Sequence, residues 1–101
     1  MYIKQIYLSR NYVNPNPKKV PGKGKIEYYI INNFGDKLHD RRPLYQYGIC
    51  VSLNYGGGLR EEVTLGELSS DLEEVLAILD TLSSNKVLPA NVAEVICDIL
   101  P

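Results

Sequence analysis

The spacing of apolar residues changes once along this chain, from every second position to roughly every third or fourth. Between residues 45 and 53, apolar side chains alternate with small or polar ones, which is the period of a half-buried β-strand. From Leu72 onward, apolar residues recur with the 3.6-residue period of an amphipathic helix. Strands that precede helices in this way predict an α+β domain.

Four strands are expected before this change, at residues 2–8, 25–32, 45–53 and 59–65. The first two ranges are rich in β-branched and aromatic residues, and the glycine-bearing residues 54–58 suit a hairpin connection between the last two. Residues 9–24 contain three prolines, two glycines and three lysines. This composition predicts a long, flexible Pro/Lys loop, and residues 33–42 predict a second polar connection.

Two helices are expected after the change. Ser70 and Glu73 have the spacing of a capping box, and Pro89 suits the first turn of the second helix. Two short apolar stripes are enough to cover one face of a four-stranded sheet. The 101 residues therefore predict a single domain, an antiparallel β-β-β-β-α-α sheet with both helices packed on one face.

The first two expected strands place apolar side chains on both faces, whereas a half-solvated antiparallel sheet should alternate apolar and polar residues. Strict alternation puts Tyr2, Ile6 and Leu8 on one face of residues 2–8. The side of residues 25–32 away from the helices carries Tyr29 and Ile31. This face should therefore expose tyrosine and isoleucine to solvent, which is typical of a protein contact. The alternatives are that residues 9–24 fold over this face or that the sheet curls into a partial barrel.

Charge is divided unevenly between the two halves of the chain. Residues 1–50 contain nine basic and three acidic side chains, and residues 51–101 contain two basic and nine acidic ones. Such asymmetry indicates an electrostatically guided partner, unless the two halves pair their charges within the folded domain. Self-association through the sheet is a further possibility and is compatible with a protein-binding function. The candidate partner-binding residues are Tyr7, Tyr29, Ile31, Lys18, Lys19, Lys23, Arg41, Arg42, Glu61 and Glu62.

Chemistry-bearing residues do not form a catalytic pattern. Cys50 lies within an expected strand and His39 within a loop, and one histidine with two separated cysteines does not make a zinc site. Residues 22–25 lack the spacing of a phosphate-binding loop. We therefore expect no enzyme activity, no cofactor and no metal. The absence of an export signal or a membrane-length apolar run predicts a cytoplasmic protein with two buried, reduced thiols, Cys50 and Cys97.

Single-stranded nucleic-acid binding is the alternative function. Basic side chains lie near tyrosines in the first half of the chain, an arrangement that suits base stacking beside neutralised phosphates. The sequence pI of about 5.8 and the lack of a recognised RNA-binding motif count against this alternative. The residues concerned are Arg10, Lys18, Lys19, Lys23 and Lys25, with Tyr12, Tyr28 and Tyr29.

Three short segments resemble a small bacterial family known only as a domain of unknown function. They are Tyr47-Gly48-Ile49, Ser-Ser-Asp-Leu at residues 69–72, and Leu-Pro-Ala-Asn-Val-Ala-Glu-Val-Ile at residues 88–96. The resemblance covers about residues 25–100 and implies no activity, cofactor or catalytic residue. The chain is also similar to small proteins of bacterial mobile elements, among which anti-CRISPR inhibitors are common. The leading hypothesis is therefore a non-catalytic protein-binding module that inhibits or regulates a larger, nucleic-acid-processing protein.

Overall fold

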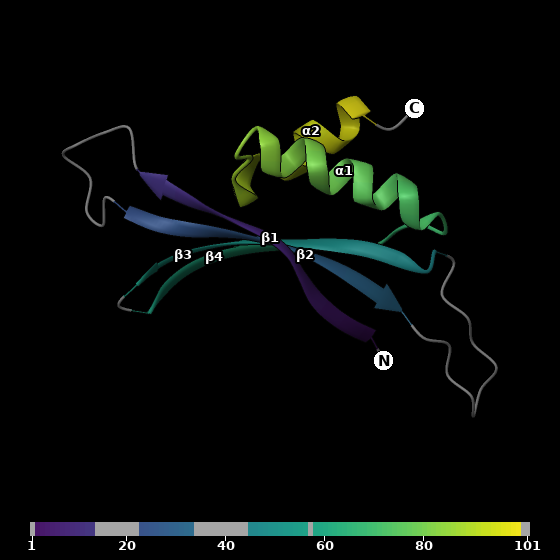
Figure 1. Ribbon diagram of the computed structural model, residues 1–101, viewed down its shortest axis with the longest axis horizontal. Coiled ribbons are helices and arrows are strands. Elements are labelled where there is room, and N and C mark those ends of the chain that lie inside the picture. Colours follow the sequence, from purple (N-terminus) through teal and green to yellow (C-terminus); the bar gives the residue numbers. More distant parts are fainter. Residues whose placement is uncertain (1, 14–22, 34–44, 57, 100–101) are drawn as a thin grey trace.

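A computed structural model describes residues 2–13, 23–33, 45–56 and 58–99. These ranges form four strands and then the helices, which confirms the expected α+β fold (Figure 1). The elements are β1 (Tyr2–Val13), β2 (Lys23–Asn33), β3 (Tyr47–Gly56), β4 (Leu59–Ser69), α1 (Leu72–Ser84), the short 3₁₀ helix η1 (Pro89–Asn91) and α2 (Val92–Ile99).

The four strands form one sheet in the order β1-β2-β3-β4, and each neighbouring pair is antiparallel. The strands β1 and β4 are therefore the two edges. Both α1 and α2 lie on the same side of the sheet, as predicted (Figure 1). We call this side the helix face and the opposite side the open face.

The strand β1 is longer than the sequence predicts. It pairs with β2 as far as Val13, which lies opposite Lys23. The expectation of a loop over residues 9–24 is therefore wrong at both ends, and residues 14–22 lie outside the described ranges. Asn11 is a poor strand former, but the antiparallel pairing with β2 overrides this local preference.

An extra residue interrupts the β1–β2 pairing at Tyr7. Ile6 lies opposite Tyr29 and Leu8 lies opposite Tyr28, which is the next residue of β2. Such a bulge reverses the side-chain alternation beyond it. Leu8 therefore lies on the helix face and Ile6 on the open face, so the prediction that both share one face is wrong.

The hydrophobic core lies between the helix face and the two helices. The middle of the core is Tyr28, whose side chain is fully buried and whose hydroxyl donates a hydrogen bond of 3.0 Å to the carbonyl of Val87. Each aliphatic side chain buried in such a core contributes about 1.5–3 kcal/mol. The buried apolar residues around it include Ile26, Ile49, Val51, Leu53, Val75, Ile78, Leu79, Leu82 and Val92.

The first helix begins one residue later than the expected capping box. Asp71, rather than Ser70, is the N-cap, and its side chain accepts a hydrogen bond of 3.0 Å from the backbone N–H of Glu73. Asp71 is itself held by a hydrogen bond from its N–H to the hydroxyl of Ser69. Glu73 and Glu74 follow in the first turn, where negative charge complements the helix dipole.

Candidate functional site

A polar network, rather than an apolar patch, covers the centre of the open face. Glu27 accepts a hydrogen bond of 2.9 Å from the Tyr29 hydroxyl and one of 2.5 Å from the Asn54 amide. The Lys4 ammonium lies 4.7 Å from the centre of the Tyr29 ring and 3.9 Å from a carboxylate oxygen of Glu62. The network therefore reaches from β1 to β4 and covers the Tyr29 ring, which is half-buried.

Ile31 is also removed from solvent on this face. Its side chain is 1% exposed, and it lies opposite Gly48, where β4 contains extra residues. The Asn33 amide donates a hydrogen bond of 2.6 Å to the Gly66 carbonyl at this point. The expectation that the open face exposes both Tyr29 and Ile31 is therefore wrong for Ile31 and holds only in part for Tyr29.

Two titratable groups of the open face are shifted toward their neutral forms. Burial raises the pKa of the Tyr29 phenol, and its hydrogen bond to Glu27 adds to this effect. Burial also raises the pKa of the Cys50 thiol, which lies 3.5 Å from the Thr64 hydroxyl. A thiol held in this form is a weak nucleophile. Cys97 is exposed, so the prediction that both thiols are buried is wrong for Cys97.

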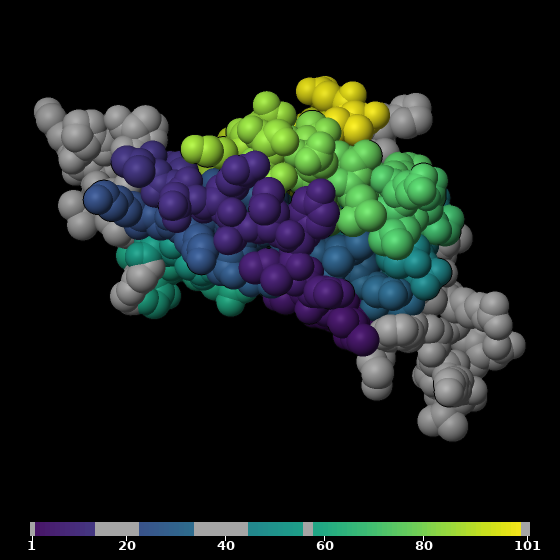
Figure 2. All heavy atoms as spheres, viewed as in Figure 1, coloured from purple at the N-terminus to yellow at the C-terminus, as the bar shows by residue number. Residues whose placement is uncertain are grey.

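Exposed apolar side chains gather instead on β1. Among the described residues, nine large apolar side chains are well exposed, and five of them belong to this one strand. The strand runs across the near side of the molecule, in purple (Figure 2). Because β1 is an edge, one side of its backbone has no strand partner among the residues that the structure describes. The five side chains and their exposed fractions are Tyr2 57%, Ile3 54%, Ile6 52%, Tyr7 37% and Val13 66%.

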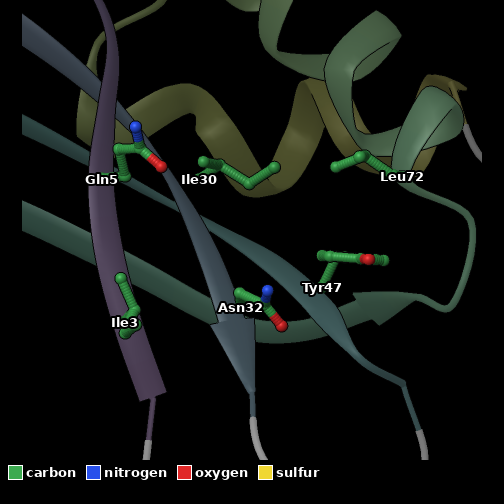
Figure 3. A pocket seen from close by; sticks show the side chains of 6 residues that line it. All are labelled: Ile3, Gln5, Ile30, Asn32, Tyr47 and Leu72. Atoms are coloured by element: carbon green, nitrogen blue, oxygen red, sulfur yellow. The ribbon is translucent and has the colours of Figure 1, made fainter.

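A groove of about 260 Å³ lies beside β1 on the helix face. Leu72 points from the start of α1 toward Ile30, and Ile3 lies on β1 at the other side (Figure 3). The side-chain amides of Gln5 and Asn32 provide polar groups, and Asn32 accepts a hydrogen bond of 3.3 Å from Gln46. Tyr47 completes the lining. The groove is therefore mainly apolar, with one amide from β1 and one from β2.

The remaining candidate residues lie apart from one another. Lys23 is exposed at the start of β2. Glu61 lies opposite the core residue Leu53, whereas Glu62 lies opposite Ser52. The two adjacent carboxylates therefore point to opposite faces. The other four candidates, Lys18, Lys19, Arg41 and Arg42, lie outside the described residues.

The tyrosines invoked for base stacking are largely enclosed. Tyr28 is fully buried, and Tyr12 packs edge-on against Tyr55 with a distance of 6.3 Å between ring centres. Tyr29 lies beneath Lys4. Tyr12 and Tyr29 are only partly buried. Lys23 and Lys25 are exposed on the neighbouring strand, but they lie on the open face, whereas Tyr12 lies on the helix face.

The exposed residues Ile3 and Ile6 were missed as site residues. Both lie within a predicted strand, but neither the strand order nor the bulge at Tyr7 can be read from local sequence. Val13 was missed because residues 9–24 were expected to form a loop. The sequence signal that could have identified these residues is composition, since β1 contains many apolar residues on both sides of the strand.

The described residues contain no group of three His, Cys, Asp or Glu side chains that could hold a metal ion. In the same ranges, no helix combines the length and apolar character required to cross a membrane.

Comparison with known proteins gives one match. A family model described as "Family of unknown function (DUF6514)" matches residues 8–101. The match begins within β1, so it extends further toward the N-terminus than the expected range of residues 25–100. No curated protein and no solved structure matches the chain.

Proposed function

The chain belongs to the DUF6514 family, and we propose that it is a non-catalytic protein-binding module that docks its partner along the outer edge of β1. One observation carries the proposal. Five of the nine well-exposed large apolar side chains among the described residues lie on this edge strand. Concentrated apolar exposure is typical of a contact with another protein.

Addition of a partner strand is the binding mode that suits this edge. Within the described ranges, no other strand pairs with the outer side of β1, so an extended segment could hydrogen-bond to its main chain, and bonds of this kind provide affinity. Ile3 offers an apolar contact on the helix face, and Ile6 offers one on the open face. The proposal therefore retains Tyr7 from the sequence analysis and replaces Ile31 with residues of the strand edge.

Charge favours particular partners. The strand β1 contains Lys4 and Arg10 and no acidic residue, and Lys23 and Lys25 continue this basic character on β2. An approaching segment with acidic side chains would therefore associate faster and in a preferred orientation. We propose that the chain acts as a small inhibitor or regulator by covering a surface of a larger protein. That this protein processes nucleic acid stays a prediction.

Photo-crosslinking tests the docking surface. A photoreactive residue replaces Ile6 on β1, and a matched control replaces Ala93, which is exposed on α2 away from this edge. In cells that naturally make the protein, we expect adducts from position 6 but not from position 93. The captured protein is then identified and purified.

Calorimetry with the purified partner completes the test. Ile6→Lys should weaken binding at least tenfold, because the substitution places a charge within an apolar contact, whereas Ala93→Lys should leave it unchanged. Circular dichroism checks that both variants fold. Equal adducts from both positions, or an unchanged affinity of Ile6→Lys, would contradict the proposal.

The nucleic-acid alternative has one observation in its favour, which is the exposure of Lys23 and Lys25 at the start of β2. Fluorescence anisotropy with a labelled single-stranded oligonucleotide separates the two functions. Under our proposal, no salt-sensitive binding is expected. Affinity that falls steeply with salt and disappears in Lys25→Glu would favour the alternative.

A further inference from the structure

We propose that, when no other partner strand is present, the occupant of the β1 edge is β1 of a second copy of this chain. The two strands would pair antiparallel about a two-fold axis, and the two sheets would join into one of eight strands. This inference rests on the proposed function, because it assigns an occupant to the same edge.

The pairing with β2 fixes the face on which each β1 side chain lies. Residues opposite Ile26, Tyr28 and Ile30 lie on the helix face, because these β2 positions face the core and the groove. The helix-face residues of β1 are Ile3, Gln5, Leu8, Arg10 and Tyr12. Its open-face residues are Tyr2, Lys4, Ile6, Ser9, Asn11 and Val13.

Directly opposed residues of an antiparallel pair must lie on the same face. Full-length pairing of β1 with its copy opposes Tyr2 with Val13, the two ends of the strand. Every opposed pair away from the two-fold axis then lies on a single face of the sheet. Tyr7 and Leu8 lie at the axis itself. The further pairs are Ile3 with Tyr12, Lys4 with Asn11, Gln5 with Arg10, and Ile6 with Ser9.

The bulge makes this register possible. In a regular strand, full-length pairing of residues 2–13 would oppose odd with even positions and therefore opposite faces. The extra residue at Tyr7 shifts the alternation by one, so the two halves of the strand become complementary. The register also opposes Tyr2 and Val13, which are 57% and 66% exposed in the single chain.

The charges of β1 are compatible with self-pairing. Lys4 and Arg10 have the same sign but lie on different faces, so the proposed register never opposes them. Arg10 of the second copy would lie opposite Gln5, which lines the groove together with Leu72 at the start of α1. The exposed carboxylates of Asp71, Glu73 and Glu74 lie at this end of α1, on the same face.

This complementarity supports a second copy as the occupant when no other partner is bound, because each copy contributes a cation at one end of β1 and an acidic helix start near the other. A two-fold arrangement also closes at two chains, whereas pairing of β1 with the acidic edge strand β4 would be heterologous and would give a ring or an open filament. The area between the two copies would contain the exposed apolar side chains of β1.

Analytical ultracentrifugation of the purified full chain tests the inference. We expect a mass of twice 11.4 kDa at micromolar concentrations. Ile6→Lys should raise the dissociation constant at least tenfold and give a monomer, and the control Ala93→Lys should remain a dimer. A monomer at every concentration, a larger assembly, or a dimer insensitive to Ile6→Lys would overturn the inference.

Cysteine crosslinking tests the register in a Cys97→Ser background. Ile6→Cys combined with Ser9→Cys should give a covalent dimer on mild oxidation, because these positions are opposed. Ile6→Cys combined with Asn11→Cys should give much less. Equal crosslinking of the two pairs would overturn the proposed register.

The two proposals fail in distinguishable ways. A monomeric free chain that still crosslinks to another protein at position 6 would overturn the second copy and retain the docking function. A dimer that survives Ile6→Lys, together with no adduct at position 6, would overturn both.

Discussion

The neighbouring strands β1 and β2 have similar composition but opposite surroundings. They pair at eleven positions, and both contain several isoleucines and tyrosines. On β2, Ile26 and Tyr28 are fully buried, whereas on β1 Ile3 and Ile6 are 54% and 52% exposed. The difference arises because β2 lies between two strands and under the helices, while β1 has a neighbour on one side only. Whether an isoleucine or a tyrosine is buried or exposed therefore depends on the position of its strand in the sheet.

The largest expected contrast comes from the same substitution on the two strands. Ile26→Ala on β2 should lower the free energy of unfolding by about 2–5 kcal/mol, because it leaves a cavity in the core. Ile3→Ala on β1 should lower it by less than about 1 kcal/mol, because more than half of this side chain is already exposed. Urea unfolding of both variants measures the contrast, and similar losses would show that β1 is as integral to the core as β2.

The next largest effect concerns stability at alkaline pH, which should depend on the buried Tyr28 of β2. Burial raises the pKa of Tyr28 to about 12, so the folded chain retains this proton where the unfolded chain loses it at about pH 10. The free energy of unfolding should therefore fall between pH 10 and 12, by about 2–3 kcal/mol from this group.

Tyr28→Phe provides the control for this pH dependence. The variant should be less stable at neutral pH by about 1–2 kcal/mol, because the Val87 carbonyl loses its hydrogen bond. Its alkaline loss should be smaller than that of the parent chain. An undiminished loss in Tyr28→Phe would assign the effect to other groups.

A smaller effect is expected from a glycine pair that compares a central strand with an edge. A methyl group at Gly48 on β3 would collide with the carbonyl oxygens of Leu65 and Gly66, whereas one at Gly66 on the edge strand β4 would meet nothing within 4 Å. Gly48→Ala should therefore cost about 1–3 kcal/mol, and Gly66→Ala should change stability by no more than about 0.5 kcal/mol. Thermal unfolding measures both, and equal stability would show that β4 can move away from Gly48.

Local sequence was sufficient for the element types and the layer order. The alternation through Ile49 and Val51 and the stripe through Val75 and Leu79 mark the side chains that pack in the core, although Cys50 and Ser52 on the other face of β3 are also fully buried. The reach of β1 and its bulge were not predictable in this way. Both depend on pairing with β2, and residues such as Asn11 have little strand preference of their own.

The candidate site was predictable only in part. Tyr7 was identified because it is apolar and lies on an expected strand. Ile31 is also an apolar residue on an expected strand. It is buried, however, because β4 lies close to Gly48, the residue opposite Ile31. This contact joins residues that are far apart in sequence. Ile3 and Ile6 became candidates only once β1 was found at the edge of the sheet.

The extra residue in β1 can be removed without changing any partnership inside the sheet. Without Tyr7, Ile6 would still lie opposite Tyr29 and Leu8 opposite Tyr28, and the two residues would simply become consecutive. Tyr7 therefore adds no residue pair to the pairing of β1 with β2. A shortened chain lacking only Tyr7 would therefore separate the demands of folding from those of the outward surface.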